Sequence, residues 1–135
     1  MDFVSLLQNV NYLAVLVATI AAFVIGAVWY SPMLFGNAWM KELGIKPGKE
    51  KKGMGALMAK SFLVTFIMAT TLAVFSPVVW DVVLSTCAIL GFGIGAMTGI
   101  NNMIYEMKSS QLMLINAGYV LMMFLAMGAI IGAWQ

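Results

Sequence analysis

The feature that most constrains this chain is a series of four apolar stretches, each nearly free of charge, at about residues 11–30, 54–75, 82–105 and 111–134. A helix rises about 1.5 Å per residue, so roughly 20 apolar residues match the roughly 30 Å hydrocarbon core of a bilayer. Only 9% of the 135 residues are charged, against roughly 25% in soluble domains. We therefore expect an all-α membrane protein, with four transmembrane helices in a compact bundle and residues 1–135 forming a single membrane domain.

The one extended polar connection, residues 31–53, joins the first two apolar stretches. Phe35, Trp39 and Leu43 recur every four residues, so we expect a short helix lying in the membrane interface. The lysines and glycines that follow lack the spacing of a phosphate-binding P-loop. We interpret the second half of this connection as a basic loop that sets the topology and faces the lipid.

Lysine placement predicts the orientation of the chain. The sequence has seven lysines and no arginine, all in or beside the 31–53 and 106–110 connections: Lys41, Lys46, Lys49, Lys51, Lys52, Lys60 and Lys108. The opposite side carries Asp2 and Asp81 and no basic residue. The positive-inside rule then predicts that both connections are cytoplasmic and both termini lie outside. We expect this membrane to be a bacterial inner (cell) membrane.

Small and aromatic residues mark the expected packing faces and membrane boundaries. Small residues spaced four apart let helices approach closely in lipid. They are Ala14, Ala18, Ala22 and Gly26 in the first stretch, Gly91, Gly95 and Gly99 in the third, and Gly128 and Gly132 in the fourth. Aromatic side chains anchor helices at the interface, and we assign this role to Trp29, Tyr30, Phe35, Trp39, Trp80 and Trp134.

The densest polar cluster of the sequence closes the third apolar stretch. Intramembrane polar groups are costly and often functional. We expect a polar pocket lined by Thr98, Asn101, Asn102, Tyr105, Glu106, Asn116 and Tyr119. Asn101 and Asn102 are adjacent and cannot share a helix face, so each should find its own partner, such as Asn116 or Tyr119. The cluster either fixes the bundle by interhelical hydrogen bonds or forms a small functional pocket or pathway.

Enzyme chemistry and metal binding find little support in the sequence. The chain has no histidine, which removes the commonest metal ligand and the usual general base near neutral pH. The thirteen methionines are scattered, and methionine commonly fills packed cores, so we do not expect a copper site. We expect no catalytic residues, no metal, no cofactor and no nucleic-acid partner.

Several sequence blocks resemble a known family of small bacterial and fungal membrane proteins. These blocks are NYLAVLVA from Asn11, GAVWYSP from Gly26, FGNAW from Phe35, NNMIYEMKS from Asn101 and NAGY from Asn116. They are similar to domain-of-unknown-function family 1761, and the resemblance covers nearly the whole chain. It implies four helices and a membrane location, and it carries no functional residue over to this chain.

Two hypotheses about function follow. The first is a structural or accessory helix bundle that associates with itself, or with a larger membrane complex, through its glycine-rich faces. The second is a homo-oligomeric channel or transporter for a small solute, which would use the polar stripe at the end of the third apolar stretch. The lipid bilayer and either a second copy or another membrane protein are the expected partners.

Overall fold

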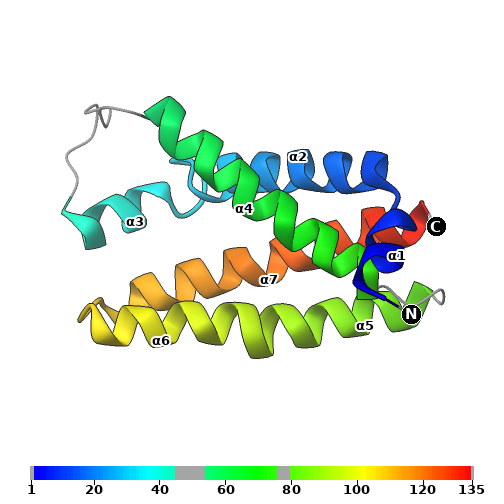
Figure 1. Cartoon of the computed structure of the whole chain (residues 1–135). Coiled ribbons are helices and arrows are strands. Elements are labelled where there is room, and N and C mark those ends of the chain that lie inside the picture. The colour runs from blue at the N-terminus through cyan, green and yellow to red at the C-terminus, as the bar shows by residue number, and fades with distance from the viewer. Residues whose placement is uncertain (1, 45–53, 76–79, 135) are drawn as a thin grey trace.

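The computed structural model of the chain describes residues 2–44, 54–75 and 80–134, and this part of the chain contains helices and no strand (Figure 1). The elements are α1 (Phe3–Gln8), α2 (Tyr12–Trp29), α3 (Gly36–Leu43), α4 (Met54–Phe75), α5 (Trp80–Leu90), the π-helix η1 (Gly91–Ala96), α6 (Met97–Tyr105) and α7 (Ser110–Ala133). Because α5, η1 and α6 follow one another without a break, they form one long helix.

The helices of the described residues are long enough to confirm the predicted fold class. Four of them have the length and apolar composition needed to cross a membrane: Tyr12–Trp29, Met58–Phe75, Val82–Tyr105 and Ser110–Ala133. The chain is therefore an all-α membrane protein. The predicted short helix in the 31–53 connection is also present, as α3.

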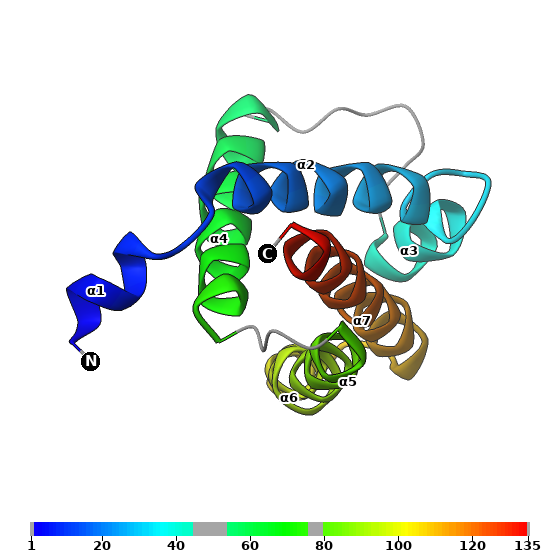
Figure 2. The same cartoon turned by 90° about the vertical axis from the view of Figure 1, so that its right-hand side faces the viewer.

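Helix α7 is the centre of the bundle. It contacts α2, α3, α4, α5, η1 and α6, and Figure 2 shows it between α2 on one side and the long α5–α6 helix on the other. Its inward side chains are large and buried, and they include Leu112, Ile115, Met123, Met127 and Ile131. Helix α2 and the long α5–α6 helix are thus held mainly by contacts with α7, whereas α4 packs more on α2 than on α7.

Small side chains on α2 allow it to cross α7 closely. Ala14, Ala18 and Ala22 are buried together with Val15 and Thr19. The Thr19 hydroxyl donates to the carbonyl of Val15, at 2.8 Å, so the buried hydroxyl has a partner within its own helix. The small-residue face of α2 is therefore used inside the bundle.

The two ends of the bundle differ in what they carry. Both termini lie at one end, and α3 lies with the turn between α6 and α7 at the other (Figure 1). Helix α3 stops at Gly44, whose φ of 70° is left-handed and suits glycine. Lys41 of α3 and Lys108 of that turn share one end of the molecule. Residues 45–53 of the predicted interfacial and basic loop 31–53 lie outside the described residues.

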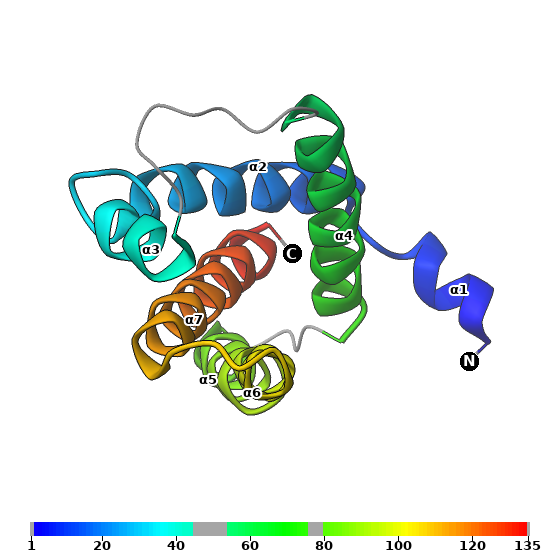
Figure 3. The ribbon, with the colours of Figure 1, turned by 90° about the vertical axis from the view of Figure 1, so that its left-hand side faces the viewer.

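Helix α1 was not predicted from the sequence. The Asp2 carboxylate accepts a hydrogen bond from the N–H of Ser5, at 2.8 Å, and so caps the helix. This hydrogen bond lowers the pKa of Asp2. Figure 3 shows α1 projecting beyond α4, on the side of the molecule away from α3.

Candidate functional site

Most residues of the expected polar pocket lie on the outside of the bundle. Five of the seven are exposed, namely Thr98, Asn101, Asn102, Tyr105 and Glu106. The side of the α6 segment that meets α7 carries apolar or small residues instead: Ala96, Gly99, Ile100 and Met103. The helical period explains this division, because positions 98, 101, 102 and 105 lie opposite positions 96, 99, 100 and 103.

The structure therefore corrects the expected pocket. Asn101 and Asn102 do not reach Asn116 or Tyr119, because α6 turns them away from α7. Among the described residues, no hydrogen bond reaches the side chain of Asn101 or Asn102. The polar stripe and the two residues of α7 belong to different parts of the molecule.

Asn116 and Tyr119 instead form a polar cluster with Tyr30 at the crossing of α2 and α7. The Tyr30 hydroxyl donates to Asn116 Oδ1, at 2.7 Å, and Asn116 Nδ2 donates to Met103 Sδ, at 3.8 Å. The Tyr119 hydroxyl donates to the carbonyl of Ala22, at 3.0 Å. The two tyrosine rings meet edge to face, with centroids 5.4 Å apart. The cluster fastens α2 to α7 by hydrogen bonds between helices.

Trp29 makes a second connection between the same helices. Its indole Nε1–H donates to the carbonyl of Ile115, at 2.9 Å. The ring lies over Gly118, where an added Cβ would come within 2.8 Å of Trp29 Cζ2. Phe35 packs on Trp29 with ring centroids 4.7 Å apart, and Trp39 packs on Tyr30 at 5.2 Å. The aromatic residues around the turn after α2 thus surround the start of α7.

The turn itself requires Gly36. The N–H of Phe35 donates to the carbonyl of Trp29, at 3.0 Å, and the N–H of Gly36 donates to the carbonyl of Ser31, at 2.9 Å. A Cβ on Gly36 would collide with the carbonyl oxygens of Tyr30 and Ser31. A larger residue would therefore open the turn that carries the aromatic cluster.

These contacts give two of the predicted aromatic anchors a role within the bundle. Trp29 and Tyr30 are half-buried and hydrogen-bonded to α7, because the turn folds them back onto the bundle. Trp134 is exposed at the end of α7, and the side chain of Trp80 lies outside what the structure describes. Sequence reasoning missed the pairing of Tyr30 with Asn116, although the density of aromatic residues around Gly36 was a usable signal.

The glycine faces are also used within one chain. An added Cβ at Gly91 would lie 2.7 Å from Phe124 Cβ, and one at Gly95 would lie 2.9 Å from Val120 Cγ1. One at Gly128 would collide with Cys87, and one at Gly26 would lie 3.1 Å from the Tyr119 hydroxyl. The expectation that the glycine-rich faces mediate self-association or docking on a larger complex therefore does not hold for these four glycines, which pack within one chain. Gly99 has no atom within 4 Å of such a Cβ, and Gly132 is half-buried.

Comparison with known proteins identifies the family. A family model described as "Protein of unknown function (DUF1761)" matches residues 13–132. The chain belongs to the DUF1761 family. No curated protein and no solved structure was found to be similar to it. In this DUF1761 chain the matched region includes the turn with its aromatic cluster, the polar stripe of α6 and α7 as far as Gly132.

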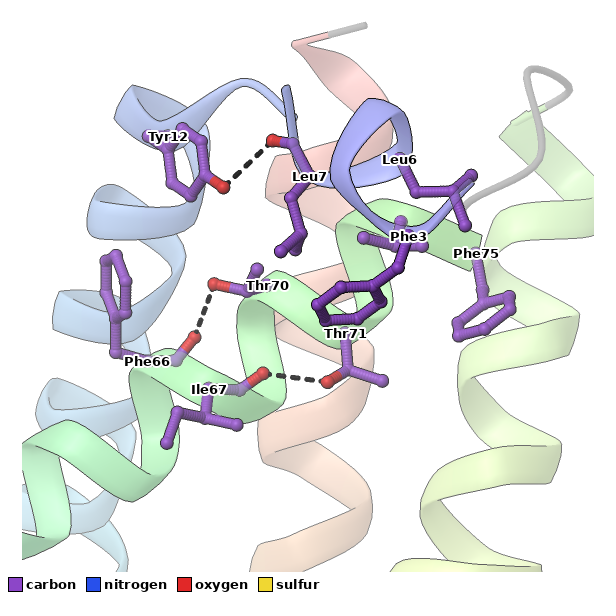
Figure 4. Close-up of a pocket in the computed structure, with 10 residues that line it drawn as sticks. Phe3, Leu6, Leu7, Tyr12, Phe66, Ile67, Thr70, Thr71 and Phe75 are labelled. Carbon is purple, nitrogen blue, oxygen red and sulfur yellow. Dashed lines mark hydrogen bonds between the residues drawn. The ribbon is translucent and has the colours of Figure 1, made fainter. Parts of the chain in front are cut away.

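A groove of this DUF1761 chain lies between α1 and α4 (Figure 4). It has a volume of about 510 Å³ and is lined mainly by Phe3, Leu6, Leu7, Phe66, Ile67 and Phe75. The hydroxyls at its surface are bonded to backbone carbonyls of the groove itself: Thr70 to Phe66, Thr71 to Ile67 and Tyr12 to Leu7, each at 2.9 Å. The groove therefore offers an incoming molecule apolar surface and no free hydrogen-bonding side chain.

Two further features could take part in chemistry, namely one cysteine and one small cavity. Cys87 is buried, beside Gly128. In the described part of the chain no three His, Cys, Asp or Glu residues lie close enough to hold a metal ion. A cavity of about 20 Å³ lies beside Asn116, between α6 and α7. A space of that size is enough for about one water molecule.

Proposed function

We propose that this DUF1761 chain is a non-catalytic structural or accessory protein of the membrane, which associates with a second copy of itself through the outward face of α6. The observation that carries the proposal is the exposed polar stripe of a spanning helix. Thr98, Asn101 and Asn102 point away from α7, and within the described residues no hydrogen bond satisfies their side chains.

The depth of the stripe gives this observation its weight. Thr98 lies seven residues before Tyr105, the last residue of α6, which corresponds to about 10 Å along the helix axis. Asn101 and Asn102 lie four and three residues before Tyr105, at about 6 and 5 Å along the axis. Polar side chains at such depth favour a partner over lipid, because hydrocarbon offers no hydrogen bonds. Interhelical hydrogen bonds of this kind contribute about 0.6 kcal/mol each on average.

A second copy of the chain can satisfy the polar stripe because one carboxamide can hydrogen-bond to another. Each carboxamide carries two N–H donors and an acceptor oxygen. Two copies inserted in the same orientation and related by a two-fold axis along the membrane normal would bring equal depths of α6 together. Asn101 and Asn102 of one copy could then bond to the same residues of the other.

We further propose that the lysine-rich end faces the cytoplasm of a bacterial inner (cell) membrane and that both termini lie outside. The support is the positive-inside rule applied to lysines that all lie in or beside two connections. A reporter cysteine at position 2 in a Cys87→Ala background should react with an impermeant maleimide in intact cells. Labelling only after cell lysis would contradict this orientation.

The first experiment on assembly is the native mass of the protein after gentle extraction. We expect a defined homo-oligomer that the Asn101→Leu, Asn102→Leu double variant shifts to a single chain of 14.6 kDa. Asn37→Leu, which alters an exposed amide on α3, is the matched control and should leave the oligomer intact. A wild-type protein that is already a single chain would refute self-association.

Two other outcomes would assign the stripe differently. A complex with a different protein, lost in the same double variant, would make that protein the partner of α6. A homo-oligomer that conducts a small solute in liposomes, with flux lost in Asn102→Ala while the assembly persists, would favour a channel or transporter. The stripe would then line a path between copies, since it faces outward from each bundle.

A further inference from the structure

A second groove lies at the lysine-rich end of the molecule, between the turn after α2 and the first turns of α7. It has a volume of about 380 Å³ and is lined by Trp29, Phe35, Gln111, Leu114, Ile115 and Gly118. Its walls are apolar apart from Gln111, which is exposed near the start of α7. The groove has the chemistry to take a hydrocarbon chain.

The walls of this groove are held in place by the contacts of Trp29. The indole is fixed by its hydrogen bond to the carbonyl of Ile115, at 2.9 Å, and by the ring of Phe35, 4.7 Å away. The close approach to Gly118 leaves the indole little room to rotate. A chain entering the groove would therefore meet a preformed surface, which lowers the entropic cost of binding.

Unpaired positive charge lies close to the groove. Lys108 comes three residues before Gln111, which is at most about 10 Å of chain. Lys41 lies on α3, which begins directly after Phe35 and packs on α7. Both lysines are exposed, and neither has an ion-pair partner among the described residues. The acids in these two segments are Glu42 and Glu106.

We propose that this groove is a binding site for an anionic phospholipid. One acyl chain occupies the apolar space beside Trp29, and the phosphate headgroup is attracted by Lys108, with Lys41 adding to the local positive charge. The argument for this occupant is charge complementarity. Neither this groove nor the groove between α1 and α4 has a charged residue in its lining. The charged residue next to the α1–α4 groove in the sequence is Asp2, which comes directly before its lining residue Phe3 and would repel an anionic headgroup.

The sequence has four further lysines, Lys46, Lys49, Lys51 and Lys52, in the connection that follows α3. Positions 41–60 carry six lysines and two glutamates, Glu42 and Glu50, and Lys108 comes two residues after Glu106. Basic residues near a membrane surface attract anionic lipids with about 1 kcal/mol each, which corresponds to about a fivefold change in affinity. The site lies within one chain, so it does not depend on self-association.

The test compares phosphatidylglycerol with phosphatidylcholine of the same acyl chains. Binding to the purified full-length protein in detergent is measured by native mass spectrometry and by the lipid-induced rise in melting temperature. We expect tighter binding of phosphatidylglycerol, weakened about fivefold by Lys108→Gln. Lys60→Gln is the control and should change the affinity less than twofold, because Lys60 is an exposed lysine on α4 and α4 contributes no residue to the lining of this groove.

A second pair of variants tests the groove itself. Leu114→Trp adds bulk at a side chain that is 73% exposed and lines the groove, and Leu63→Trp does the same at a side chain that is 60% exposed on α4. We expect only Leu114→Trp to abolish the preference for phosphatidylglycerol. If Leu114→Trp does not fold, the lysine pair still decides the question. Equal binding of both lipids, or an equal loss in Lys108→Gln and Lys60→Gln, would overturn the proposal.

Discussion

Replacing single glycines of η1 by alanine tests the packing of the bundle most directly. Gly91 and Gly93 lie two residues apart in the same π-helix, so alanine changes their backbone preferences by similar amounts. Their surroundings differ. A Cβ at Gly91 would lie 2.7 Å from Phe124 Cβ and 2.9 Å from Phe124 Cγ, whereas one at Gly93 meets nothing within 4 Å.

The expected magnitude follows from these distances. Ordinary carbon–carbon contacts are about 3.5–4.0 Å, so Gly91→Ala must move η1 away from α7 by several tenths of an ångström or more. The clashing atom is the first atom of the Phe124 side chain, which cannot rotate away. Overpacking of this kind costs about 1–3 kcal/mol. Both variants replace glycine by alanine in the same helix, so the change in helix propensity cancels when the two are compared. We therefore expect Gly91→Ala to be less stable than Gly93→Ala by about 1–3 kcal/mol.

The assay is reversible unfolding of both variants in mixed detergent micelles, with helix content followed by circular dichroism. The difference between the two free energies of unfolding is the steric cost at Gly91. Equal stabilities would refute the packing of η1 on Phe124. A Gly93→Ala variant that is the less stable of the two would show that the outer face of η1 is covered in the assembled protein.

Two further predictions concern single hydrogen bonds. Tyr30→Phe removes the donor to Asn116 Oδ1 and should lower the free energy of unfolding by about 0.5–1.5 kcal/mol. The control is Tyr105→Phe, at a ring that is 83% exposed, which should leave the free energy of unfolding unchanged. Equal effects of the two variants would contradict the polar cluster. The N–H of Ser5 lowers the pKa of Asp2, so the cap stabilises α1 above the ordinary pKa of an aspartate and is lost as the pH falls through the lowered value. Hydrogen exchange at the Ser5 amide, corrected for its intrinsic pH dependence, should accelerate on acidification in the wild type. It should stay constant in Asp2→Asn, because asparagine keeps the capping oxygen and does not titrate. Identical pH profiles of the two proteins would contradict the cap.

The turn after α2, with its aromatic residues, shows which contacts the sequence pattern left undecided. The residues from Trp29 to Trp39 lie in or between two of the five blocks that carried the family resemblance, and Trp29 and Tyr30 were assigned to the membrane interface. Their hydrogen bonds to Ile115 and Asn116 join residues 86 positions apart. No local pattern specifies such a pairing, because it depends on how α2 crosses α7. The same holds for Asn116, which found Tyr30 where the sequence suggested Asn101 or Asn102.

The sequence by itself determined the class of the protein and its four spanning helices, because length and apolar composition are enough to distinguish a membrane helix from a soluble one. It could not determine which face of each helix points inward. In water an apolar face identifies the core, but in a bilayer lipid and protein interior are both apolar, so hydrophobicity does not separate the two sides. Gly91 and Gly93 are the same residue in the same helix, and only the tertiary structure decided that one packs on Phe124 and the other faces outward.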